Sequence, residues 1–126
     1  MAGPLVGPMT LYAQFRPAFS EVTDSRTYPI EWLDAEVWSG KAQVWGADDA
    51  CLVTTVKTFP TGAFEVHVLV AAGDMGRLVN ETIKQVEEWA QDIGALFVTI
   101  ASKQAWARIM APHGYAHWQT ELRKEV

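Results

Sequence analysis

Cysteine is nearly absent from this sequence: Cys51 is the only one among 126 residues. A lone cysteine excludes an intrachain disulfide and a cysteine-based zinc cluster. Cys51 lies in an apolar run, so we expect a small core side chain rather than a nucleophile. His113 and His117 are separated by a predicted turn, which does not favour their convergence on one metal ion. The sequence therefore predicts no bound metal.

Positive charge is also scarce, with 10 Lys and Arg against 15 Asp and Glu and a net charge of −5 at pH 7. Nucleic acid and anionic lipid both attract clustered basic side chains, so we expect neither as a partner. No run approaches the roughly 20 apolar residues that cross a bilayer. The first 15 residues contain no Lys or Arg, unlike a secretory signal peptide. These features predict a soluble protein that no signal peptide exports.

Glycine and proline interrupt residues 1–8, which read MAGPLVGP. This composition fits neither a regular helix nor a central strand. Two interpretations remain open: a frayed terminus, or an extended arm that lies on a partner through the apolar Leu5 and Val6. Residues 9–126 have the length of one domain. We therefore predict an N-terminal arm over 1–8 and a single domain over 9–126.

The hydrophobic pattern of residues 9–126 predicts alternating strands and helices. The expected elements are strand 9–16, helix 29–37, strands 42–47, 51–59 and 63–71, helix 77–93, strand 95–101, a short helix after Ser102, and strand 116–125. Strands 63–71 and 95–101 are joined by a helix, so they should be parallel, whereas the earlier neighbours are antiparallel. The fold class is thus α/β, with a mixed sheet of about six strands and helices on both faces.

Strand 63–71 and helix 77–93 carry the clearest periodicities. Alternation in the strand places Phe64, Val66, Val68 and Val70 on one face. In the helix, apolar residues recur at steps of three and four and predict one buried stripe. The stripe consists of Val79, Ile83, Val86, Ala90 and Ile93. A short glycine loop containing Gly73 and Gly76 joins the two elements, and anions often bind where a strand passes into a helix N-terminus.

This element order resembles the GNAT family of acetyl-CoA-dependent N-acetyltransferases over residues 9–126. Residues 15–18 (Phe-Arg-Pro-Ala) look like the end of the family's first strand. Residues 64–93 look like its central strand, cofactor loop and following helix. Residues 107–115 look like its segment that ends in glycine and an aromatic residue, here Gly114 and Tyr115.

The chain is similar in particular to small GNAT-like proteins that tailed bacteriophages encode. The features that carry this likeness are a short helix before Ser39-Gly40-Lys41 and the ending Leu122-Arg123-Lys124-Glu125-Val126. The likeness implies a phage protein located in the host cytoplasm or in the virion.

The cofactor loop departs from the family pattern. The resemblance implies that acetyl-CoA, if it binds, is held by Val70, Ala71, Gly73, Gly76 and Arg77. The two glycines are three residues apart instead of two, and no Arg or Gln precedes them. Asp74 stands at the expected helix N-cap, where a carboxylate occupies N–H donors and repels a pyrophosphate. Arg77 offsets this repulsion in part.

The candidate catalytic groups are few. Many family members place a tyrosine ahead of the final glycine, where it protonates the leaving thiolate; Met110 stands there and cannot donate a proton. Tyr115 is the one substitute that can be named, and the alternative interpretation, which the position after Gly114 favours, is a tyrosine in the core or at its rim. Glu65 and His67 share one strand face, where either could act as the general base for an amine. The alternative for His67 is a hydrogen-bonded structural histidine.

Tryptophan is abundant, with six residues in the chain. Because tryptophan is enriched in protein interfaces, we expect Trp89 and Trp118 to contact a partner, or to lie at the rim of the core. Two functions follow. The first is a GNAT-fold phage protein with a degenerate acetyl-CoA loop, acting without catalysis as a structural or accessory virion component that binds other phage proteins or itself. The second is a small acetyl-CoA-dependent N-acetyltransferase that uses Glu65 or His67 as general base.

Overall fold

The computed structural model describes residues 7–102 and 104–126. Leu5 and Val6, the predicted contacts of the arm, lie outside the described residues. Gly7 is the N-cap of the first helix and Pro8 is its first residue. Proline suits that position because its missing N–H would have no partner there. The first helix thus begins within the segment predicted as an arm.

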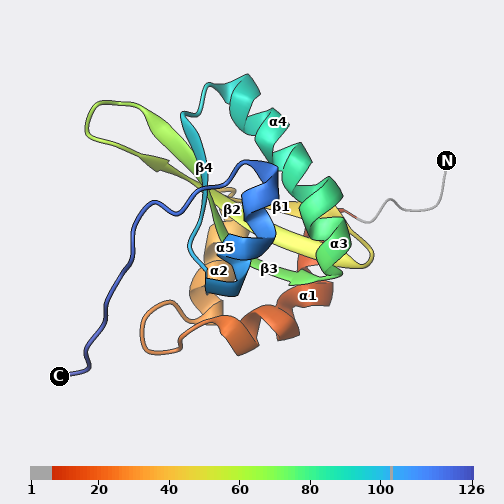
Figure 1. Ribbon diagram of the computed structural model, residues 1–126. Coiled ribbons are helices and arrows are strands. Elements are labelled where there is room, and N and C mark those ends of the chain that lie inside the picture. The colour runs from red at the N-terminus through yellow and green to blue at the C-terminus, as the bar shows by residue number, and fades with distance from the viewer. Residues whose placement is uncertain (1–6, 103) are drawn as a thin grey trace, which may run out of the picture.

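The described residues form a four-stranded sheet flanked by helices (Figure 1). The elements are α1 (Pro8–Val22), α2 (Ile30–Trp38), β1 (Ala42–Ala47), β2 (Ala50–Thr58), β3 (Phe64–Gly73), α3 (Met75–Arg77), the π-helical turn η1 (Leu78–Thr82), α4 (Ile83–Ile93), β4 (Phe97–Ile100), α5 (Gln104–Met110) and the 3-10 turn η2 (Ala111–His113). The strand order is β1-β2-β3-β4. The first two pairings are antiparallel, and β3 pairs with β4 in parallel. The mixed α/β sheet is confirmed, but it has four strands and not about six.

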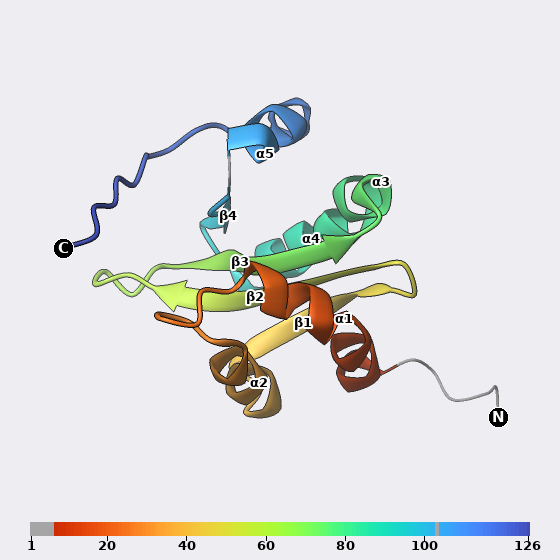
Figure 2. The same cartoon turned by 90° about the horizontal axis from the view of Figure 1, so that it is seen from below.

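Each face of the sheet is covered by helices, as predicted (Figure 2). On one face α1 and α2 form a core with β1 and β2, in which Phe19, Leu33 and Val53 are almost fully buried. On the other face η1 and α4 pack on β2 and β3. Cys51 is fully buried, and this burial raises the pKa of its thiol to about 12. A small core cysteine is therefore confirmed.

The segment predicted as strand 9–16 is part of helix α1, so that prediction is wrong. The same holds for residues 15–18, which the family likeness placed at the end of a strand. Buried Leu11, Tyr12 and Phe19 lie on one helical face. The Tyr12 hydroxyl donates to Asp34 of α2 at 2.7 Å, and Arg16 pairs with the same carboxylate at 2.7 Å. Helical spacing of the large side chains thus outweighed the local strand pattern.

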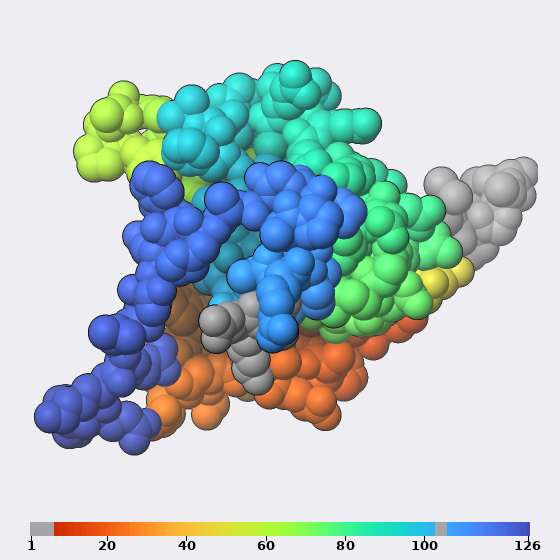
Figure 3. Space-filling view, viewed as in Figure 1, coloured from red at the N-terminus to blue at the C-terminus, as the bar shows by residue number. Residues whose placement is uncertain are grey.

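The predicted strand 116–125 is also wrong. Residues 116–126 form no strand and are exposed, with Trp118 88% exposed. Alternating polarity stabilises a strand only when a sheet edge pairs with it, and here the segment runs away from the sheet. Its end lies against the α1–α2 loop (Figure 3), where Arg26 pairs with Glu125 at 2.5 Å and Arg123 with Asp24 at 3.6 Å.

The long amphipathic helix predicted over 77–93 is present as α3, η1 and α4. Val79, Ile83, Val86 and Ala90 are buried as expected, whereas Ile93 is exposed at the last turn. Gly94 ends the helix in a left-handed conformation at φ 85°. Among the described residues no helix has the length and apolar character of a membrane span.

Candidate functional site

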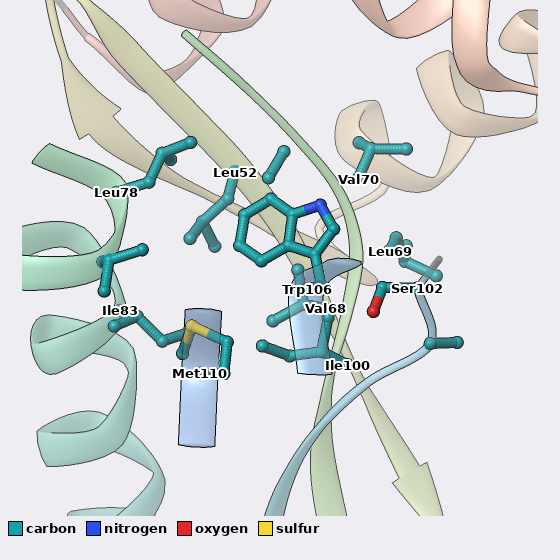
Figure 4. A pocket seen from close by; sticks show the side chains of 13 residues that line it. Leu52, Val68, Leu69, Val70, Leu78, Ile83, Ile100, Ser102, Trp106 and Met110 are labelled. Carbon is teal, nitrogen blue, oxygen red and sulfur yellow. The ribbon is translucent and has the colours of Figure 1, made fainter. Parts of the chain in front are cut away.

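Strands β3 and β4 part from one another and leave an opening in the sheet. Their pairing covers only Glu65–Val68 against Phe97–Ile100, while β3 continues to Gly73. A cavity of about 80 Å³ follows this separation and opens to solvent. Trp106 and Met110 of α5 line it together with apolar side chains of β3 and the η1–α4 segment (Figure 4). The opening therefore offers an apolar slot beside unpaired strand backbone.

A β-bulge in β3 lies at the edge of this opening. Val53 pairs with Val70 and the next residue, Thr54, pairs with Val68, so Leu69 is the extra residue. Val66 and Val68 pack in the core under α4, but Val70 packs in the core under α1 and α2. The prediction that Val70 shares a face with Val66 and Val68 is thus wrong, because the bulge inverts the alternation. Leu69, Val70 and Ala71 all line the opening.

The loop after β3 is closed by its own hydrogen bonds. Gly73 has φ 107°, and its missing Cβ leaves room for the Asp49 carbonyl, to which the Asp74 N–H donates at 2.7 Å. The Asp74 carboxylate accepts from the Arg77 N–H at 2.8 Å. Asp74 is thus the N-cap that the sequence predicted, and it occupies one of the donors that an anionic ligand would need. Gly76 is helical, and a Cβ added there would lie 3.4 Å from the Asp74 carboxylate.

The Arg77 guanidinium is already neutralised. Its Nε lies 2.8 Å from Asp49 and its Nη1 lies 2.7 Å from Glu81. The Asp49 charge, followed by that of Glu81, raises the pKa of Arg77. Together with Asp74, three carboxylates surround one cation, so the loop carries excess negative charge and disfavours a phosphate group.

Glu65 and His67 of β3 are joined through Thr99 of β4. The Thr99 hydroxyl donates to the Glu65 carboxylate and lies 2.8 Å from Nδ1 of His67. The side chains share the sheet face opposite Val66 and Val68, because successive strand residues alternate. Leu69 is two residues beyond His67 and Ala101 two beyond Thr99, and both line the opening. The hydrogen-bonded chain therefore lies about 7 Å, one same-face strand step, from the slot.

The pKa of His67 lies below its ordinary value. Burial is the main cause, the Lys57 charge acts in the same direction, and the Glu65 charge opposes both. Lys57 stands directly across from Glu65 on β2. His67 is therefore uncharged at neutral pH, the state that a general base requires.

This pKa predicts a pH dependence of folding stability. In the unfolded chain His67 titrates near 6.5, above its value in the fold. Between the two values the unfolded state binds more protons, so this contribution raises stability as pH increases and is complete above about pH 6.5. Denaturant midpoints of the protein and of His67→Gln, measured between pH 5 and 8, should converge toward low pH. Parallel curves would show that His67 has no lowered pKa.

No family model and no curated protein matches the sequence. A predicted acetyltransferase from Clostridium acetobutylicum, solved with acetyl-CoA, has a TM-score of 0.68 at 8% identity and covers 97% of this chain and 92% of its own. A GCN5-related N-acetyltransferase from Ralstonia eutropha has a TM-score of 0.67 at 16% identity, and the match covers 94% of this chain and 91% of that protein. Glucosamine-6-phosphate N-acetyltransferase from Arabidopsis thaliana has a TM-score of 0.67 at 8% identity, and the match covers 97% of this chain and 94% of that protein. The chain has the GNAT fold.

Within this GNAT fold, the side chains of Tyr115 and Met110 have different surroundings. The Tyr115 hydroxyl donates to Glu87 of α4 at 2.7 Å, and burial together with that carboxylate raises the tyrosine pKa. Tyr115 is not among the described residues that line the opening, whereas Met110 lines it and is buried. Tyr115 thus fixes the chain after η2 on α4, whereas the opening is lined by Met110, a thioether that cannot donate a proton.

The two predicted contact tryptophans differ in environment. Trp89 is half-buried and its ring centroid lies 5.4 Å from that of Trp45. Trp118 is almost fully exposed. Within the described ranges, 7–102 and 104–126, no group of three His, Cys, Asp or Glu side chains could hold a metal ion.

Thr99 is the residue of this site that sequence reasoning missed. A signal was present, because Thr99 is the only polar side chain in the apolar run 95–101. Its importance depends on the parallel register of β3 and β4, which sets Thr99 opposite His67. Register across a helical crossover cannot be read from either strand alone.

Proposed function

We propose that the protein is an N-acyltransferase that uses acetyl-CoA as donor and His67 as general base. The observation that carries this proposal is the Glu65–Thr99–His67 chain next to the opening between β3 and β4. The neighbours in the GNAT fold include one solved with acetyl-CoA. That likeness supports the donor, and the hydrogen-bonded chain supports the base.

The residues present fit the donor in part. The apolar slot and the unpaired β3 backbone at Leu69–Ala71 suit an acyl-pantetheine arm, but the carboxylates around Arg77 oppose a diphosphate. When bound, acetyl-CoA supplies an acetyl thioester, which is an electrophile. His67 would accept a proton from the acceptor amine, whose nitrogen then forms the amide bond as the thioester C–S bond breaks and CoA leaves as its thiolate. Lys57 and the buried setting keep His67 unprotonated until that step.

The test combines ligand binding with turnover. Ligand at 100 times its dissociation constant adds about 2.7 kcal/mol, which raises the melting temperature by several degrees. We expect such a shift with millimolar acetyl-CoA, and release of free CoA thiol when a panel of primary amines is added. A cooperative melt that acetyl-CoA leaves unmoved would contradict the proposal.

Replacing Asp74 by asparagine should strengthen acetyl-CoA binding about tenfold. Asparagine caps a helix as well as aspartate does, so the loop is kept while one negative charge beside the diphosphate is removed. Isothermal titration of both proteins measures the change. Asp92→Asn is the matched control, since it removes one charge about 25 Å further along the helix. Equal affinities for Asp74→Asn and the parent would place the diphosphate away from this loop.

A second candidate is a role without catalysis, which the capped loop, the neutralised Arg77 and Met110 favour. In this alternative the protein acts through protein contacts, with exposed Trp118 and half-buried Trp89 as contact residues. The finer expectation of a phage accessory component, in the virion or the host cytoplasm, remains a prediction from the sequence alone. Copurification of the protein with virions, lost in Trp118→Ala, would support it.

A further inference from the structure

Thr99 lies between the two candidate bases of β3, and its hydroxyl has a single proton. That proton is donated to the Glu65 carboxylate, which has none to give. The oxygen of Thr99 therefore meets Nδ1 of His67, at 2.8 Å, as an acceptor. An acceptor at that position requires the proton of the neutral imidazole to be on Nδ1.

We propose that Thr99 is a positioning residue that, held by Glu65, fixes His67 as the Nδ1–H tautomer and leaves the Nε2 lone pair free to take the proton of the acceptor. The role assigned to Nε2 rests on the proposed function, whereas the tautomer itself follows from the hydrogen bonds. The Glu65 carboxylate is thereby assigned to orienting Thr99 and is not itself the base. The sequence left Glu65 and His67 as alternatives; the hydrogen-bond chain gives them different roles.

The geometry makes the arrangement rigid. Glu65 and His67 are two residues apart on β3, and Thr99 stands on β4, in register with His67. Both strands are paired here, one residue before the opening begins. One hydrogen bond, between Nδ1 and the Thr99 hydroxyl, orients the imidazole, and the second, from Thr99 to Glu65, fixes the hydroxyl that accepts it. The charged groups that act on His67 are Lys57 of β2 and Glu65 of β3, and neither contacts Nε2 in the described structure.

Nitrogen-15 NMR of the imidazole ring tests the inference without any ligand. The native protein at pH 8 should show His67 as one tautomer, protonated at Nδ1. Thr99→Val, which keeps the shape of the side chain and removes the hydroxyl, should replace this pattern by an averaged one. Thr99→Ser restores the hydroxyl and should restore the pattern. A native His67 protonated at Nε2, or an unchanged spectrum in Thr99→Val, would overturn the inference.

Thr55→Val is the matched control. Thr55 stands opposite His67 on β2, but its hydroxyl donates to the Lys41 carbonyl at 3.3 Å. Its replacement should leave the imidazole spectrum unchanged, and an altered tautomer there would contradict the specific role of Thr99. In turnover, Thr99→Val should lower kcat roughly tenfold with KM little changed, the size expected for one hydrogen bond.

The two hypotheses fail in different ways. If the native protein shows no turnover with any amine but His67 is protonated at Nδ1 in a Thr99-dependent manner, the proposed function is wrong and the tautomer assignment stands. If turnover is present and His67 is protonated at Nε2, the assignment to Thr99 is overturned and the proposed function remains.

Discussion

His67→Gln is expected to lower kcat/KM for acyl transfer by about 10²–10⁴-fold, the usual contribution of a general base. Glutamine retains a polar side chain of similar reach, but it cannot accept a proton at neutral pH. Folding should survive, because the replacement keeps a donor toward Thr99 and removes no large apolar group. The measurement is the initial rate of CoA thiol release with the best amine of the panel, together with the melting temperature.

His117→Gln serves as the control for this change. His117 lies in the exposed C-terminal segment, where its Nε2 lies 3.0 Å from the Thr120 hydroxyl. The control should keep the native rate. A His67→Gln protein with native kcat/KM would exclude His67 as the base and leave the hydrogen-bonded structural histidine as its interpretation.

The pH profile gives the same residue a second signature. The pKa of His67 is lowered from its ordinary value of about 6.5 by burial and by Lys57. The imidazole is therefore an available base above about pH 6.5 and becomes protonated only at lower pH. The acid limb of kcat/KM should therefore lie below pH 6.5 and should be absent from the residual rate of His67→Gln. If the acid limb of His67→Gln coincided with that of the native protein, the titration would belong to another group.

Local pattern was sufficient for the elements that are long or strongly periodic. Alternation and β-branched residues located β1, β2 and β3, and the apolar stripe located α4. The parallel pairing of β3 and β4 followed from the helix between them. These features depend on residues close in the sequence or on a general rule of chain connection.

Features that depend on distant partners were not predictable. Residues 9–16 read as a strand until Tyr12 and Arg16 meet Asp34 on α2. Residues 116–125 alternate in polarity, but none of the described strands pairs with them. The bulge at Leu69 needs β2 opposite it before Val70 can be assigned to a face. In the first and third cases the deciding contact is more than ten residues away in the chain, and in the second no described strand supplies one.

The candidate site was predicted in the same uneven way. Glu65 and His67 were named because they share a strand face, and Asp74 because it precedes a helix. Thr99 completes the chain only through the sheet register. Of the residues assigned to the cofactor loop, Arg77 is paired with two carboxylates. One belongs to Glu81 of the following helix and the other to Asp49 in the distant β1–β2 turn, which the sequence pattern does not connect to the loop.

Gly73→Ala is expected to destabilise the fold by about 3 kcal/mol or more, enough to lower the melting temperature by roughly 10 °C. A Cβ on Gly73 would lie 2.3 Å from the Asp49 carbonyl oxygen and 2.7 Å from the Ala50 Cα. Both atoms are backbone, so relief requires the β1–β2 turn to move. The φ of 107° adds strain, since side chains rarely tolerate that region.

Gly76→Ala is the matched control from the same loop. Gly76 is helical, and a Cβ there would meet only the flexible Asp74 carboxylate, at 3.4 Å. Alanine in a helix stabilises by up to about 1 kcal/mol relative to glycine, so this variant should melt at or above the native temperature. Chemical denaturation of the two variants measures the difference. Equal stabilities would show that Gly73 is kept for ligand approach and not for the close packing of β3 against the β1–β2 turn, and would return both glycines to the cofactor loop.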